Sequence, residues 1–163
     1  MLVAVISDTH MAAGGRRRLP ERCVELIRSA DLVVHAGDIM SLEALAELEA
    51  VGPPVRAITG NMDGWELRDR LPAETELELE GVRLAMIHDA GPAAGRLARM
   101  RRHFPDADAV VFGHSHIPLH ERDGGFQIFN PGSPTERRRA PHHSMGVARI
   151  DGDAIEFELV QLG

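Results

Sequence analysis

The feature that most constrains this chain is a set of short apolar runs, each of which ends in an aspartate, asparagine or histidine. The run at residues 108–112 stops at Gly113, and His114 and His116 follow it. A continuous Val/Phe run of this length, bounded by turn residues, predicts a strand that is buried on both faces, as in a parallel sheet. The two imidazoles then leave the sheet at its carboxyl edge. Alone, such a pair is weak support for a site, because polar residues are common in loops after strands.

The first 63 residues alternate strand-like and helix-like segments. Apolar runs at 2–7, 32–34 and 55–59 are separated by two segments with helical spacing of their apolar residues. Pro20 lies near the start of the first helix, and Ser41 is suited to cap the second. This alternation predicts two successive β-α-β units, with parallel strands and right-handed crossovers.

The remainder of the chain is dominated by hairpins. Three pairs of runs are each joined by a short turn that contains glycine: 75–79 with 82–87, 119–122 with 126–129, and 145–150 with 154–160. A further helix is expected over roughly residues 93–104. The order of elements predicts an α/β fold in which two sheets pack face to face with helices outside. We expect a single domain over residues 1–163, since this length suits one core.

Composition excludes several classes of function. The formal net charge of -7 argues against a general nucleic-acid-binding surface, so no stable nucleic-acid binding is expected. No apolar segment approaches the roughly 20 residues that cross a bilayer, and none resembles a signal peptide, which predicts a cytoplasmic protein without membrane association. The one cysteine, Cys23, is expected to be a small core residue. The sequence leaves a homo-oligomer open.

Seven polar residues follow the predicted strands: Asp8, His10, Asp38, Asn61, His88, His114 and His116. Ligands of open α/β sheets bind outside the carboxyl ends of the strands, so all seven side chains can meet at one edge. Each has an ordinary explanation singly, as a turn residue or a core histidine. The gathering of all seven at one edge of the sheet has no such ordinary explanation. Carboxylate, amide and imidazole ligands without thiolates suit manganese, iron, zinc or nickel.

Electrostatics favours two ions rather than one. Two carboxylates about 4 Å apart repel by roughly 4 kcal/mol at an effective dielectric near 20, and a divalent ion turns this repulsion into attraction. The ligands outnumber what one tetrahedral ion needs, which predicts two ions that share a carboxylate. Asp38 is the candidate bridge. The resulting centre is positively charged overall, so it would attract anions, phosphate esters above all.

The ordered blocks Asp8-x-His10, Gly37-Asp38, Gly60-Asn61, His88 and Gly113-His114-x-His116 resemble the signature of the calcineurin-like metallophosphoesterases. The resemblance covers the whole chain, and its size and the segment 130–133 are similar to the small single-domain bacterial and archaeal phosphodiesterase branch. It implies a four-layer α/β/β/α sandwich of two mixed sheets flanked by helices. It also implies one ion held by Asp8, His10, Asp38 and His116, and another held by Asp38, Asn61, His88 and His114.

The activity expected from this resemblance is metal-dependent hydrolysis of a small phosphodiester or nucleotide. A hydroxide that bridges two divalent ions would attack phosphorus in line with the leaving group. Manganese is our first choice of metal, with nickel, iron or zinc as alternatives.

Two departures from the family pattern bear on the chemistry. Many larger members carry a histidine after the metal-binding asparagine, whereas this chain has Met62, which cannot donate a proton. Asp63 is the candidate catalytic residue, and the alternative is that it orients Asn61 or His10. Asp89 replaces a usual glycine after His88. Because Met62 cannot protonate a leaving alkoxide, esters with acidic leaving groups should be the better substrates.

Residues near these blocks have two interpretations each. Ser133 is the candidate substrate-binding residue, or its hydroxyl stabilises a turn. Trp65 and Leu67 either wall the substrate pocket or anchor the loop after Asn61. The arginines at 16–18 either clamp a phosphate or form a solvated charge run, and we expect His35 to be a surface or structural residue.

The main alternative function is a protein-interaction scaffold on the same fold, as in a eukaryotic retromer subunit that resembles this branch. Intact ligands at all seven positions argue against it, while Met62 leaves room for it. Amidohydrolases also contain a His-x-His motif. Their barrels need about 250 residues and carry the motif after the first strand, so length and order exclude them.

Overall fold

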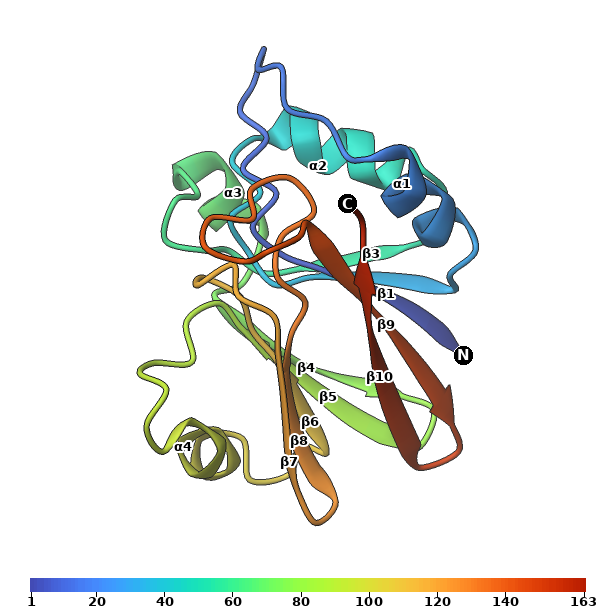
Figure 1. Cartoon of the computed structure of the whole chain (residues 1–163), viewed down its shortest axis with the longest axis vertical. Helices are drawn as coiled ribbons and strands as arrows, with labels where there is room; N and C mark the ends of the chain where they lie inside the picture. Colours follow the sequence, from blue (N-terminus) through green and yellow to red (C-terminus); the bar gives the residue numbers. More distant parts are fainter.

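Two five-stranded sheets pack face to face in the computed structural model, which describes all residues from 1 to 163 (Figure 1). The first sheet contains, in spatial order, β10 (Ala154–Gln161), β9 (Ser144–Asp151), β1 (Leu2–Ile6), β2 (Leu32–His35) and β3 (Val55–Ala57). The second contains β4 (Glu74–Leu79), β5 (Val82–Ile87), β6 (Ala109–Val111), β8 (Phe126–Asn130) and β7 (Leu119–Asp123).

Four helices cover the outer faces of the two sheets. They are α1 (Glu21–Arg28), α2 (Leu42–Glu49), α3 (Trp65–Arg70) and α4 (Arg96–His103). The first three lie on the side of the first sheet, and α4 lies on the far side of the second (Figure 1). The predicted four-layer α/β/β/α sandwich is therefore confirmed. None of these helices combines the length and the apolar character that crossing a bilayer requires.

Both sheets are mixed, and the pairing of their parallel strands explains where the site lies. In the first sheet β1, β2 and β3 run parallel, which confirms the two predicted β-α-β units. In the second, β6 runs parallel to both β5 and β8. The residues of β6 are completely buried, as the apolar run predicts. The loops that follow β1, β2, β3, β5 and β6 carry all seven polar side chains found from the sequence.

Local signals explain the helices that the sequence predicts. The Ser41 hydroxyl accepts a hydrogen bond from the Ala44 amide at 3.1 Å, so it caps α2, whose Leu45 and Leu48 are buried. Pro20 precedes the first residue of α1. Cys23 is completely buried in this helix, and burial raises the pKa of its thiol to about 12, which confirms a core residue rather than a nucleophile.

The sequence does not predict α3, and α4 is shorter than expected. The six residues of α3 are too few to show a helical period, and only Leu67 among them is buried. Leu67 packs in a cluster with α2 and β3, so it anchors this segment. Helix α4 begins only at Arg96 because Gly95 before it has a left-handed backbone conformation, with φ of 70°.

The largest apolar cluster lies between the two sheets and contains buried residues from both. Its closest packing involves Phe129 of β8, which stacks on Phe157 at 4.6 Å between ring centroids. Gly146 of β9 faces the same ring. A Cβ atom at this glycine would lie 2.3 Å from the Phe129 ring, so the absence of a side chain here lets the sheets approach.

We predict that Gly146→Ala lowers the free energy of unfolding by about 1 to 3 kcal/mol, because the added methyl group overpacks the space against Phe129. Urea denaturation measures this loss. Gly125→Ala is the matched control, since a Cβ there meets nothing within 4 Å, and it should change stability by less than about 1 kcal/mol. Equal effects of the two substitutions would contradict this account of the packing.

Candidate metal centre

The structure brings all seven predicted side chains together in one cluster. Two groups of histidines and aspartates have ligand atoms within 4.8 Å of one another: Asp8, His10 and His116, and Asp8, Asp38 and His88. Asn61 joins the second group, because its Oδ1 lies 3.1 Å from His88 Nε2 and 3.0 Å from His114 Nδ1. Loops from both sheets therefore contribute to a single site.

The histidines form two pairs. The ring centroids of His10 and His116 are 4.9 Å apart, and those of His88 and His114 are 5.3 Å apart. The first pair faces Asp8, whose Oδ1 lies 3.4 Å from His116 Nε2 and 3.8 Å from His10 Nε2. The second pair faces Asn61. The structure therefore places His10 with His116 beside Asp8, and His88 with His114 beside Asn61.

Asp38 lies between the two sets. Its Oδ2 is 3.3 Å from both His10 Nε2 and His88 Nε2, so one carboxylate oxygen is equally close to one histidine of each pair. Asp8 Oδ1 also faces both of these histidines, at the longer distance of 3.8 Å. The geometry therefore favours Asp38 as the shared ligand.

Five of the seven residues have a positive φ, which is uncommon for residues other than glycine. The angles are 56° at Asp8, 44° at His10, 59° at Asp38, 71° at His114 and 61° at His116. Such conformations cost of order 1 kcal/mol or more each and persist where surrounding contacts enforce them. Their concentration in one cluster indicates that the loops are held in place for a function.

Two glycines make room for the buried carboxylates. A Cβ atom at Gly60 would lie 2.1 Å from Asp38 Oδ1, and one at Gly113 would lie 2.5 Å from Asp8 Oδ2. Both glycines belong to the blocks recognised in the sequence. At each position a carboxylate approaches so closely that a side chain would not fit.

The charges of the cluster compensate one another. Burial alone would raise the pKa of Asp8, but the close imidazoles of His10 and His116 hold this pKa well below its usual range. Burial likewise opposes ionisation of Asp38, but the imidazoles of His10 and His88, each 3.3 Å away, outweigh it and lower the pKa. Burial would lower the pKa of His10, but Asp38 and Asp8 raise it to about 9. Protons on the imidazoles thus balance the two carboxylates.

The residues fit divalent cations in the same place. His10 Nε2 and His116 Nε2 are buried and have no hydrogen-bond partner, which is rare for buried polar atoms. His116 donates its Nδ1 hydrogen to the Glu136 carbonyl, so the lone pair of Nε2 faces the carboxylates. His88 Nδ1 is held in the same way by the Ala36 carbonyl at 2.7 Å. A cation would satisfy both orphaned nitrogens.

Asp63 is committed to the backbone of the neighbouring loops. Its Oδ2 accepts hydrogen bonds from the amides of Asp38 at 3.0 Å and Gly60 at 2.8 Å, and its Oδ1 accepts one from Met40 at 2.7 Å. The side chain is buried and ties the loop after β2 to the loop after β3. These contacts are those of a positioning residue, and the expected catalytic role of Asp63 stays a prediction.

Ser133 supports the loop after β1. It is completely buried, its hydroxyl donates to the Asp8 carbonyl at 2.8 Å, and the Glu136 amide donates to the hydroxyl at 2.9 Å. Through these two hydrogen bonds Ser133 holds the backbone of Asp8 and Glu136 in place, and none of its own surface is exposed. The expected contact with a substrate stays a prediction.

Two residues outside the predicted ligands support the site, and sequence reasoning missed the first of them. Glu136 holds His116 through its main-chain carbonyl, and its carboxylate lies 3.6 Å from His10 Nδ1. A carbonyl leaves no trace in a sequence, since any residue supplies one. One of the arginines at 16–18 also contributes here, because Arg17 donates to the His10 carbonyl at 3.1 Å and pairs with Glu136 at 3.4 Å.

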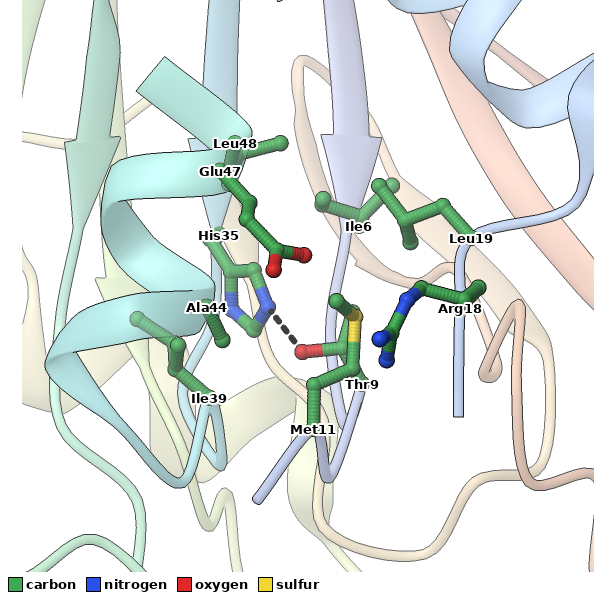
Figure 2. A pocket seen from close by; sticks show the side chains of 10 residues that line it. All are labelled: Ile6, Thr9, Met11, Arg18, Leu19, His35, Ile39, Ala44, Glu47 and Leu48. Atoms are coloured by element: carbon green, nitrogen blue, oxygen red, sulfur yellow. Dashed lines mark hydrogen bonds between the residues drawn. The ribbon is translucent and has the colours of Figure 1, made fainter. Parts of the chain in front are cut away.

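His35 is the second supporting residue. It is completely buried, its Nδ1 accepts from the Gly37 amide, and its Nε2 bonds Thr9 Oγ1 at 3.0 Å (Figure 2). Burial lowers the pKa of this imidazole to about 4, so it is neutral and keeps one tautomer. It lies in the wall of a cavity of about 140 Å³ between α2 and the loop that carries Thr9 and Met11 (Figure 2). The structural role expected for His35 is therefore confirmed.

A four-layer sandwich with imidazole, carboxylate and amide ligands at the carboxyl edge of its strands defines a metal-binding protein of the α/β class. The chain belongs to the calcineurin-like phosphoesterase superfamily, whose domain matches residues 1–153. The family resemblance seen in the sequence is thereby confirmed. The family identifies the chain as a phosphoesterase.

Individual proteins agree with this membership. A probable metallophosphoesterase of Methanothermobacter thermautotrophicus is 34% identical over 168 residues, which cover 100% of this chain and 94% of the relative. A phosphodiesterase of Methanocaldococcus jannaschii is 24% identical, over 81% of this chain and 83% of its own. Among solved structures, vacuolar protein sorting 29 from Cryptosporidium parvum superposes with a TM-score of 0.84 at 21% identity, covering 99% of this chain and 91% of its own.

Without metal, we predict that the free energy of unfolding falls as the pH rises from 6.5 to 9, by at most about 3 kcal/mol. The folded protein holds the His10 proton up to about pH 9, whereas the unfolded chain releases it near 6.5, so this stabilisation is complete below 6.5 and is lost through 9. Urea denaturation in a chelator at several pH values measures the slope. His10→Asn should flatten it, and a stability that rises over this range would contradict the prediction.

We also predict that Asp63→Asn destabilises the protein by about 2 kcal/mol or more, because an amide group cannot accept all three backbone hydrogen bonds. Urea denaturation of the metal-free protein measures this. Asp69→Asn in α3 is the control, because Asp69 is exposed and should be neutral within about 0.5 kcal/mol. If Asp63→Asn were equally neutral, Asp63 would not be a positioning residue.

Proposed function

We propose that this protein is a phosphodiesterase that uses two divalent metal ions. The observation that carries the proposal is the position of Asp38 Oδ2, which lies 3.3 Å from one histidine of each pair, beside two buried imidazole nitrogens without partners. Asp8, His10, Asp38 and His116 would hold one ion. Asp38, Asn61, His88 and His114 would hold the other.

Two bound divalent ions would supply activated water for attack on phosphorus and positive charge to stabilise the phosphoryl oxygens. The chain prepares the ligands for this role. Ser7 donates to Asp8 Oδ2 at 2.7 Å, and the Met62 amide donates to Asp38 Oδ1 at 2.8 Å, so each carboxylate keeps its other oxygen directed at the histidines. The main-chain carbonyls at Ala36 and Glu136 orient His88 and His116.

Burial in the cluster indicates the side from which a substrate would enter. Asp8 and His116 are completely buried, whereas Asn61 is exposed and the side chain of His114 is 44% exposed. A phosphate group would therefore approach over Asn61 and His114. Its alkoxide leaving group would meet Met62 next to Asn61, and methionine cannot protonate it. This supports a preference for esters whose leaving groups are acidic.

A phosphodiester is the substrate class that we favour over a phosphomonoester. The proposal draws on the relative from Methanocaldococcus jannaschii that bears the name phosphodiesterase. Manganese as the metal and the cytoplasm as the location are parts of the same proposal, as is a small phosphodiester or nucleotide as substrate.

The test compares hydrolysis of bis(p-nitrophenyl) phosphate and p-nitrophenyl phosphate by protein that has been stripped of metal and reloaded with manganese or nickel. We expect faster turnover of the diester, and Asp38→Ala should reduce it by at least about 100-fold. Manganese at 100 times its dissociation constant should raise the melting temperature of the wild type by roughly 5 to 11 °C, and this gain should be lost in Asp38→Ala.

Asp106→Ala is the matched control, because the Asp106 side chain is 76% exposed on the surface, and it should keep both the turnover and the thermal shift. An unaltered rate in Asp38→Ala would rule out Asp38 as the shared ligand. The absence of turnover with every metal would instead favour the interaction scaffold.

A further inference from the structure

We propose that Trp65, flanked by Met62 and Ile117, forms a stacking platform beside the metal centre for the base of a nucleotide ester. This inference rests on the proposed phosphodiesterase function and narrows its substrate class. In this proposal the group attached to the phosphate gains its binding energy by stacking on a flat aromatic ring, and this ring lies outside the ligand cluster.

Large exposed apolar side chains gather near the site. The structure has five of them: Met1, Met62, Trp65, Ile117 and Leu159. Met62 directly follows Asn61, Trp65 is four residues after Asn61, and Ile117 directly follows His116. Trp65 is the only tryptophan of the chain, and it is 77% exposed. Tryptophan is normally largely buried, so such exposure beside a candidate site points to a ligand.

Hydrogen bonds fix these residues relative to the metal centre. The Met62 amide donates to Asp38 Oδ1 at 2.8 Å, so the main chain at Met62 touches the proposed shared ligand. Arg68 lies one turn after Trp65 in α3 and donates to the Asp63 carbonyl at 2.7 Å and the Gly60 carbonyl at 3.3 Å. Residues three apart lie on the same side of a helix. Trp65 therefore lies on the same side of α3 as Arg68, whose guanidinium contacts the Asn61 loop.

Ile117 comes from the other sheet but reaches the same entrance. The contact of 3.0 Å between Asn61 Oδ1 and His114 Nδ1 joins the loop after β3 to the loop after β6. Figure 1 shows α3 and the loop after β6 on the same side of the molecule. The loop that carries Met62 and the loop that carries Ile117 thus meet at the exposed edge formed by Asn61 and His114.

The chemistry of this rim favours a flat aromatic ring over a charged group. An indole ring and the thioether of Met62 offer polarisable surface, and stacking of a base on an aromatic side chain contributes roughly 1 to 3 kcal/mol. Stacking uses the face that all bases share, so we expect weak discrimination among bases. The phosphate would lie over the metal ligands while its base covers Trp65.

The experiment compares binding of adenosine 5′-monophosphate and ribose 5-phosphate to the manganese-loaded protein, since these two probes differ only in the base. Calorimetry should show that the nucleotide binds roughly 5- to 150-fold more tightly. The single tryptophan provides a second readout, because the nucleotide should change its emission and the sugar phosphate should not.

Trp65→Ala should bring the ratio of the two dissociation constants close to one, and Trp65→Phe should restore most of it. Leu159→Ala is the matched control. Leu159 is also exposed, at 41%, but it lies on β10 at the opposite edge of the first sheet from β3, roughly 19 Å away at normal strand spacing. It should leave the ratio unchanged.

Equal affinities of the wild type for the two probes, or an unchanged ratio in Trp65→Ala, would overturn the platform even if bis(p-nitrophenyl) phosphate is hydrolysed. If no diester is hydrolysed with any metal, the phosphodiesterase proposal fails by itself. If Trp65 contributes to binding of another protein but not of the nucleotide, the inference is also refuted.

Discussion

The structure depends on the charge balance between two buried carboxylates and the histidines around them. Asp8 and Asp38 are almost completely shielded from water, and a buried carboxylate without compensation is strongly unfavourable. His10 and His88 each lie 3.3 Å from Asp38, and both lie 3.8 Å from Asp8, so positive charge on these two imidazoles reaches both aspartates from two sheets. Protons on the imidazoles supply this charge without metal, and cations would supply it in the proposed enzyme. The contact between the sheets and the binding of ions thus both depend on neutralising the buried charges of Asp8 and Asp38.

Hydrogen bonds around the cluster keep this balance in one geometry. Asp63 joins the loops after β2 and β3, Ser133 holds the loop after β1, and neutral His35 links Thr9 with Gly37. Asp63 and Ser133 bond the backbone of ligand residues, and His35 bonds the Thr9 hydroxyl and the Gly37 amide, so none of the three touches the ligand atoms. They explain how several residues persist at positive φ, since a strained loop needs contacts that exclude its relaxed conformations. A site with ligands held this firmly loses little entropy when ions bind.

The cluster is asymmetric, and this asymmetry has chemical consequences. The side that contains Asp8 and His116 is sealed, whereas the side that contains Asn61 and His114 opens to solvent. The open side carries no proton donor at Met62, and it is bordered by exposed apolar side chains. The proposed enzyme would therefore obtain its rate from metal-assisted attack and from acidic leaving groups. Its affinity would come from the ring that it binds outside the cluster.

The sequence by itself determined the layers, the strands along the chain and the seven candidate ligands, because apolar runs that end in ligand-type side chains report both a buried strand and its carboxyl edge. The spatial order of the strands in each sheet came from the tertiary structure. Gly60 and Gly113 were readable as parts of the same blocks, although only the structure shows that each makes room for a carboxylate. The tertiary structure alone decided that Asp63 and Ser133 point into the supporting loops, that Glu136 acts through its carbonyl, and that α3 exists. These outcomes depend on the directions of hydrogen bonds between segments distant in sequence, and on the packing of Leu67 against α2 and β3. Local residue patterns predict neither these hydrogen-bond directions nor this packing.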